Sequence, residues 1–171
     1  MDGTTNFSRN IPLFSVSIAL IKRDEIILGS VYNPISRELF FADSTGAYLN
    51  DKKINVSSNA KLSSSIVSQS FDYSNEKRKD NLKNIEKIFF KIEGFRLFHS
   101  TALELCNVAC GKIDGYIVSC ANPWDIAAGA FIVEKAGGKV TNFDGSNWNY
   151  MKPRIIATNG LIQGELLNVL R

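Results

Sequence analysis

Residues 122–138 read NPWDIAAGAFIVEKAGG, and the interpretation of the architecture depends most on this stretch. Pro123 fits the first turn of a helix, and the two glycines at the end are typical of a helix terminus. From about Trp124 to Ala136 almost every residue is apolar, which leaves little polar face. We therefore expect a helix that is buried on most sides and lies between two layers of other elements.

The first third of the chain predicts an antiparallel sheet. From Leu13 to Ile21, large apolar side chains alternate with mostly small ones, as they do in a strand. Further strands are predicted from Ile26 to Tyr32 and from Glu38 to Ala42, with turn signals between and after them. Because the connections are short, we expect these strands to form a meander.

The rest of the chain alternates between predicted strands and predicted helices. Thr101 and Glu104 have the spacing of a capping box, which predicts a helix start. The expected strands are Ser65–Ser70, Ile113–Val118, the segment at Val140 and Arg154–Ala157, and the expected helices are Leu82–Ile92, Thr101–Gly111 and Leu161–Leu170. This order predicts an α/β (α+β) fold with one antiparallel and one mixed sheet. Residues 1–171 are interpreted as a single domain, antiparallel over 1–62 and alternating over 63–171.

Composition excludes several classes of protein. The 171 residues carry a net charge of only +3 with scattered lysines, so we expect no nucleic-acid partner. No apolar run approaches the roughly 18 residues of a membrane span, and no signal peptide is visible. Three cysteines without a CxxC pattern argue against a disulfide framework or a zinc site. These features favour a cytoplasmic protein with reduced thiols and no membrane contact.

Two segments carry residues suited to chemistry. In residues 1–7, an aspartate precedes a glycine and two threonines, so bare amides could approach an anion while the acid holds a cation. A plain Asp-Gly turn is the alternative. In residues 122–129, Asp125 lies where a helix dipole favours negative charge. A capping aspartate beside a core tryptophan is the alternative there. Spacing alone does not show that Asp2 and Asp125 meet in space.

The ordered motifs resemble the inositol monophosphatase family. Met1–Phe7 is similar to the end of the family motif D-P-x-D-G-T-x-N-F, with Met1 at the variable position. Pro123–Gly138 is similar to W-D-x-A-A-G followed by E-A-G-G, which appears here as EKAGG. Further similar segments are Tyr32–Pro34, Gly46–Asn50, Arg96–Leu105 and Ala157–Gly160. The resemblance therefore extends over nearly the whole chain.

The resemblance implies a layered αβαβα fold and Mg²⁺-assisted hydrolysis of a phosphate monoester, with a homodimer as the assembly. Mg²⁺ suits that task because it takes oxygen ligands and shares its shell with waters and phosphate. By position, the implied metal ligands are Asp2, Asp125 and the backbone carbonyl of Met1. The implied catalytic residues are Asp2, Asp125 and Thr4, which would orient the attacking water. The implied substrate-binding residues are Gly3, Thr4, Thr5, Ser100, Thr101 and Asp125.

The chain also departs from the family pattern. The family's upstream glutamate and the aspartate before its Pro precede this sequence, and so do the opening helices of the fold. We therefore expect an incomplete first-metal site and weak or absent activity of these 171 residues. His99 stands where the family usually has Gly, and Val118 stands where it often has Glu. His99 is interpreted either as a partly buried residue bonded to backbone or as a substrate contact.

Three functions stay open at this point. The first is hydrolysis of inositol 1-monophosphate. The second keeps the chemistry with another substrate: histidinol phosphate, a bisphosphate nucleotide or fructose bisphosphate, because Val118 cannot accept a hydrogen bond from a sugar hydroxyl. The third is a non-catalytic remnant that acts as an interaction module.

Overall fold

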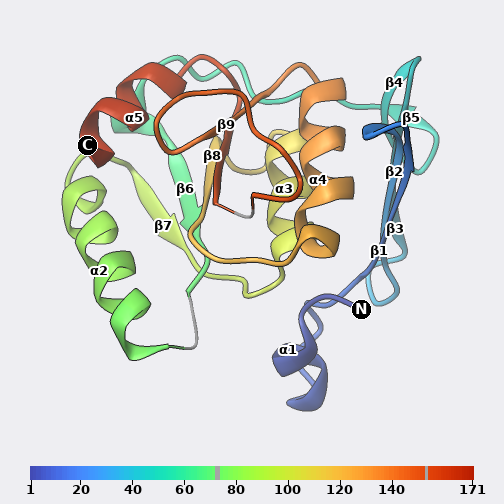
Figure 1. Cartoon of the computed structure of the whole chain (residues 1–171), viewed down its shortest axis with the longest axis horizontal. Coiled ribbons are helices and arrows are strands. Elements are labelled where there is room, and N and C mark those ends of the chain that lie inside the picture. The colour runs from blue at the N-terminus through green and yellow to red at the C-terminus, as the bar shows by residue number, and fades with distance from the viewer. Residues whose placement is uncertain (72–73, 153) are drawn as a thin grey trace.

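The computed structural model describes residues 1–71, 74–152 and 154–171, and these residues form four layers: sheet, helices, sheet, helices (Figure 1). In the first sheet every neighbouring pair is antiparallel, in sequence order, which confirms the predicted meander. Its strands are β1 (Val16–Lys22), β2 (Glu25–Asn33), β3 (Glu38–Asp43), β4 (Gly46–Leu49) and β5 (Lys52–Lys53).

The second sheet has the strand order β7-β6-β8-β10-β9 and is mixed, as predicted. Strand β6 pairs in parallel with β7 and β8, whereas β10 is antiparallel to β8 and β9. Its strands are β6 (Ile66–Gln69), β7 (Gly94–Arg96), β8 (Gly115–Val118), β9 (Lys139–Asn142) and β10 (Ile155–Thr158). The sequence did not predict β7.

Helices α3 and α4 lie between the two sheets, and α2 and α5 cover the far side of the second sheet (Figure 1). These are four of the five layers of the expected αβαβα arrangement. The helices are α1 (Thr4–Ser8), α2 (Asn75–Phe89), α3 (Thr101–Ala109), α4 (Pro123–Lys135) and α5 (Gln163–Leu170), with a 3₁₀ turn η1 (Leu62–Ser64). None of the helices in the described residues is both long and apolar enough to cross a membrane.

Helix α4 is the buried centre of the molecule, as its composition predicts. Phe131 is 8% exposed and Ile132 is fully buried. The helix also lies very close to its neighbours: a Cβ on Gly129 would come within 2.7 Å of the Cβ of Leu105 in α3. On the other side, a Cβ on Gly29 of β2 would come within 2.7 Å of the Ala128 carbonyl oxygen. Glycine at both positions is therefore required by close packing.

Strand β1 places its small residues, not its large ones, against the core. Ala19 packs against the cluster around α4, opposite Gly29 of β2. The alternating large residues Val16, Ile18 and Leu20 are 47%, 59% and 52% exposed. The outer face of the first sheet is thus apolar, and no helix of the described residues covers it.

Two local predictions need correction. Residues Thr4–Ser8 form a short helix that the sequence did not predict. The capping box of Thr101 and Glu104 is wrong: the N-cap of α3 is Ser100, and the Glu104 carboxylate points into the interior. A hydroxyl–acid spacing cannot distinguish an acid that caps a helix from one that is buried beneath it.

Candidate active site

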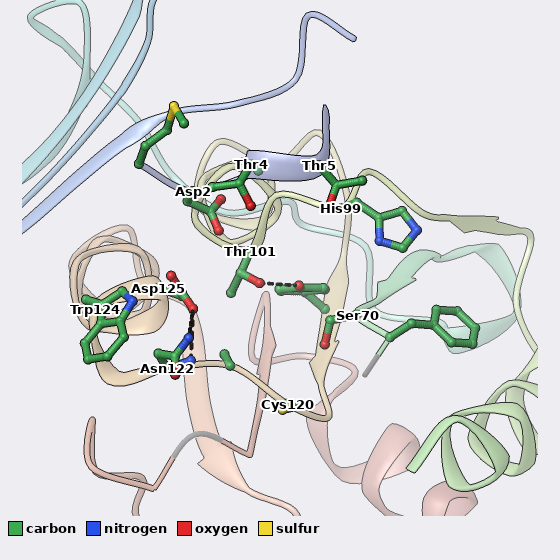
Figure 2. A pocket seen from close by; sticks show the side chains of 15 residues that line it. Asp2, Thr4, Thr5, Ser70, His99, Thr101, Cys120, Asn122, Trp124 and Asp125 are labelled. Carbon is green, nitrogen blue, oxygen red and sulfur yellow. Dashed lines mark hydrogen bonds between the residues drawn. The ribbon is translucent and has the colours of Figure 1, made fainter. Parts of the chain in front are cut away.

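A pocket of about 310 Å³ opens where the N-terminal segment meets the first turns of α3 and α4 and the carboxyl ends of β6 and β8 (Figure 2). Asp2, Thr4, Thr101 and Asp125 all line it. Residues of the two segments 1–7 and 122–129 therefore meet in one pocket, which their spacing in the sequence could not show.

Asp2 is held by backbone and side-chain hydrogen bonds. Its amide donates to the Ser15 carbonyl at 2.8 Å, and the Ser15 amide donates back at 3.0 Å. Its carboxylate Oδ2 accepts hydrogen bonds from the Ser100 hydroxyl and from the Ala102 amide, the latter at 3.1 Å. Asp2 thus supplies the negative charge at the N-terminus of α3 that Ser100 and Glu104 do not.

The loop after Asp2 is fixed by a glycine and an asparagine. Gly3 has a φ of 80°, and a Cβ there would come within 2.7 Å of the Leu13 carbonyl oxygen, so only glycine fits. The buried Asn6 amide Nδ2 donates to the Leu13 and Phe98 carbonyls at 2.8 and 2.7 Å, and to the His99 carbonyl at 3.4 Å. Asn6 therefore joins the Asp2 segment to the loop before α3. Sequence reasoning did not identify this role.

Asp125 lies in the first turn of α4, half-buried at the pocket wall. Its Oδ2 accepts from the Asn122 amide at 2.9 Å and from the Asn122 side-chain Nδ2 at 3.1 Å. The capping alternative is therefore confirmed for this residue. It does not compete with a binding role, because the same carboxylate also lines the pocket.

The surroundings of Asp2 change its pKa. Burial raises the pKa of Asp2 above its ordinary value, the hydrogen bonds from Ser100 and Ala102 lower it, and the negative charge of Asp125 raises it again. A bound cation would offset both the cost of burying the Asp2 charge and its repulsion by Asp125.

The pocket offers a small set of oxygen donors for a cation. No group of three His, Cys, Asp or Glu side chains suited to a metal is found among the described residues. Two carboxylates with waters and a phosphate nevertheless form a donor set that Mg²⁺ accepts, because it keeps much of its water shell. The residues present therefore fit a magnesium ion that shares its shell with a ligand.

Hydroxyl groups surround the two acids. Thr4, Thr5 and Thr101 line the pocket; in Figure 2, Thr4 lies beside Asp2 and Thr5 lies nearer to His99. The Thr101 hydroxyl accepts from the Tyr116 hydroxyl at 3.2 Å, so its own hydrogen can be donated to a ligand. Ser100 differs from the expectation: it is fully buried, and its hydroxyl donates to Asp2. It can affect a substrate only through Asp2.

Glu104 is a buried acid beneath the pocket. It is fully buried, its Oε1 accepts from the Phe98 amide at 3.3 Å, and its Oε2 has no hydrogen-bond partner in the described part of the chain. Burial raises its pKa to about 8, against the lowering effect of the Phe98 amide and the nearby Tyr116 and Ser68 hydroxyls. The carboxyl is therefore mostly protonated at neutral pH.

His99 lies on the pocket wall. Its side chain is exposed, lines the pocket and has its ring centroid 6.5 Å from that of Phe71. The interpretation as a partly buried side chain bonded to backbone is wrong, because the side chain is exposed and the hydrogen bond found for His99 among the described residues is accepted by its backbone carbonyl, from Asn6. Val118, in contrast, is fully buried in the core and does not line the pocket.

Several pocket residues were not predicted. Trp124, which the alternative interpretation of this segment placed in the core, is 69% exposed and forms part of the pocket wall. Ser70 and Cys120 follow β6 and β8 and line the pocket as well. The signal for these two was available, because the carboxyl ends of parallel strands meet at one edge of a sheet, where ligands commonly bind.

The sequence profile described as the Inositol monophosphatase family matches residues 1–171. An inositol-1-monophosphatase of Synechocystis is 43% identical over 99% of this chain and 60% of its own length. Inositol monophosphatase 2 of Solanum lycopersicum is 40% identical over 99% of this chain and 66% of its own length. The chain thus spans less than two thirds of these relatives.

Solved structures agree with these similarities. The suhB protein of Bartonella henselae superposes with a TM-score of 0.95 at 37% identity, over 99% of this chain and 67% of the other. The inositol monophosphatase of Anabaena gives a TM-score of 0.93 at 38% identity, over 99% of this chain and 68% of the other. The fold class predicted from the motifs is therefore confirmed.

Proposed function

Because this chain belongs to the inositol monophosphatase family, we propose that its pocket binds a phosphate monoester and hydrolyses it with Mg²⁺ held by Asp2, Asp125 and the Met1 carbonyl. The observation that carries the proposal is the convergence of Asp2 and Asp125, which are far apart in the sequence, beside three threonine side chains. Inositol 1-monophosphate is the first substrate to test, because relatives bear the name inositol-1-monophosphatase.

The chain's own groups divide the work. A bound Mg²⁺ supplies charge neutralisation of the phosphoryl oxygens and a more acidic water. Ser100 and the Ala102 amide hold the Asp2 carboxylate in one orientation. Thr101 can donate its hydroxyl hydrogen to a phosphate oxygen. Thr4 stands beside Asp2, where its hydroxyl can orient a water, and the amides of Gly3 and Thr4 are the proposed contacts of the phosphate.

The test is phosphate release from inositol 1-phosphate by residues 1–171 across a Mg²⁺ series. We expect slow, Mg²⁺-dependent release, slow because the described chain brings only two carboxylates to the pocket. Asp125→Asn keeps the size of the side chain but removes the charge that a hard cation needs, so release should fall by about 10²-fold or more. Asp144→Asn is the matched control, because that exposed aspartate also accepts from nearby groups, at Ser146, but lies outside the pocket.

Phosphate release that is independent of the Mg²⁺ concentration, or that is unchanged in Asp125→Asn, would contradict the proposal. The same variants separate the alternative of another class. Relatives from Haemophilus influenzae and Pasteurella multocida bear the name Nus factor SuhB. An interaction module would keep its function in Asp125→Asn.

The proposal also includes a homodimer, which sedimentation equilibrium of the chain would test.

A second substrate class has one observation in its favour. His99 places an imidazole on the pocket wall, and a relative from Thermotoga maritima, 36% identical, bears the name fructose-1,6-bisphosphatase/inositol-1-monophosphatase. The phosphate-release series should therefore include a sugar bisphosphate.

A further inference from the structure

The backbone at His99 is left-handed, with a φ of 57°. Glycine adopts this conformation without steric cost, whereas a side chain brings its Cβ too close to the following carbonyl. The conformation is imposed by the surrounding loop, because Asn6 binds the carbonyls of Phe98 and His99 and the next residue, Ser100, is buried as the N-cap of α3. The loop therefore favours glycine, yet a large side chain is present.

That side chain has no structural partner that explains it. It is exposed, and its imidazole forms no hydrogen bond with any residue that the structure describes. Among the described residues, its ring forms a tilted pair with the ring of Phe71. Figure 2 shows the imidazole at the pocket wall, on the opposite side from Asp125 and Trp124. Both ring nitrogens are therefore available to a ligand in the pocket.

The charges of the pocket indicate what that ligand group would be. Asp2 and Asp125 are acidic, and among the described side chains that line the pocket His99 is the only basic one. An imidazole donates hydrogen bonds to anions and can carry a positive charge near neutral pH. A second anionic group, away from the reacting phosphate, would find a cationic side-chain partner in His99, the one basic side chain among the described lining residues.

We propose that His99 is a specificity-determining residue that binds a second phosphate of the substrate, so that the pocket favours sugar bisphosphates over sugar monophosphates. This inference rests on the proposed function, since it assumes that the reacting phosphate binds near Asp2 and Asp125. Its physical basis is a side chain that is costly in a left-handed backbone, has no hydrogen-bond partner among the described residues, and lies on the opposite side of the pocket from Asp125.

The chain has one histidine, so the imidazole signals in an NMR spectrum belong to His99. The 171-residue chain with Mg²⁺ is titrated with inorganic phosphate, fructose 6-phosphate and fructose 1,6-bisphosphate. We expect the bisphosphate to bind about tenfold more tightly than the monophosphate, since one charge-assisted hydrogen bond is gained. Only the bisphosphate should shift the ring signals strongly.

Variants separate the side chain from the backbone. His99→Gly and His99→Asn, which both tolerate the left-handed backbone, should weaken bisphosphate binding so that the two affinities come within about twofold of each other. Arg37→Gly is the matched control: Arg37 also has a left-handed φ, of 55°, is exposed, and its carbonyl accepts from an asparagine side chain, but it lies outside the pocket. This control should keep the preference.

Each other outcome has a defined meaning. If both esters bind but the bisphosphate neither shifts the His99 ring nor loses its preference in His99→Gly, the inference is overturned and the proposed function stands. If Arg37→Gly removes the preference equally, the effect is not due to His99, and the inference is again overturned. If the unaltered chain binds no phosphate ester, the proposed function itself fails, and the inference with it.

Discussion

Glu104 makes the stability of this protein depend on pH in a specific direction. Its pKa is about 8 in the folded chain against an ordinary value of 4.5, so between these values the folded chain holds a proton that the unfolded chain releases. The stabilisation is complete below pH 4.5 and is lost as the pH rises toward 8. The free energy of unfolding should fall by up to about 1.4 kcal/mol per pH unit in this window.

Replacing Glu104 by Gln removes the titratable carboxyl group but keeps the size and shape of the side chain. The amide oxygen can still accept from the Phe98 amide, and the NH₂ group can donate where the protonated acid would, toward Ser68 or Tyr116. Since about 2.5 pH units separate 4.5 from pH 7, Glu104→Gln should be more stable than the unaltered chain by about 3 kcal/mol at pH 7. At pH 5 the two should differ by less than about 1 kcal/mol.

Urea unfolding at pH 5, 6, 7 and 8, followed by tryptophan fluorescence, measures this difference through the transition midpoint at constant slope. Glu25→Gln is the control, because Glu25 is exposed at the start of β2 and its removal should not alter the pH dependence. Parallel stability curves for Glu104→Gln and the unaltered chain would refute the reasoning, since they would mean that Glu104 carries the same charge in both states.

Three further outcomes follow from the contacts described. Ser100→Ala removes a hydrogen bond that lowers the pKa of Asp2, so the carboxyl ¹³C titration of Asp2 should move to still higher pH; an unchanged titration would contradict the contact. Asn6→Ala removes the donor of three buried or half-buried carbonyls and should lower the free energy of unfolding by about 2–3 kcal/mol in urea, whereas a change below about 0.5 kcal/mol would exclude a clamping role. Gly129→Ala places a Cβ within 2.7 Å of the Cβ of Leu105 and should lower the free energy of unfolding by about 1–3 kcal/mol in urea. An unchanged value would mean that α3 and α4 move apart without cost.

The parts of the fold that sequence predicted are those fixed by local pattern. Helix α4 is apolar nearly all round and must be buried whatever surrounds it. The strands of the first sheet follow one another through short turns, so each finds its partner nearby. Helix α1 was missed because its threonines are weak helix formers and a contact from Asn6 to distant Phe98 fixes it.

The candidate site could be predicted only through the resemblance to a family. No local signal shows that the helix begins after Ser100 and that the Ser100 hydroxyl donates to distant Asp2. The capping box predicted for Thr101 and Glu104 was therefore wrong. Trp124 begins a helix that is apolar from Ile126 onward, which made a core position one interpretation, but it is 69% exposed and lines the pocket together with the N-terminal segment. Such contacts between distant residues are invisible to periodicity and spacing.

The bond between Asp2 and the start of α3 also has a kinetic consequence. It joins residues 98 and 100 positions apart, whereas the bridge from Asp2 to Ser15 and the hairpins of the first sheet are local. Closing a long loop costs entropy that only later contacts repay, so local pairs form first and distant ones last. The pocket should therefore be completed at the end of refolding, after the first sheet is in place. Binding of a phosphate ester should then report a late step of folding, because it requires both Asp2 and Asp125 to be in place.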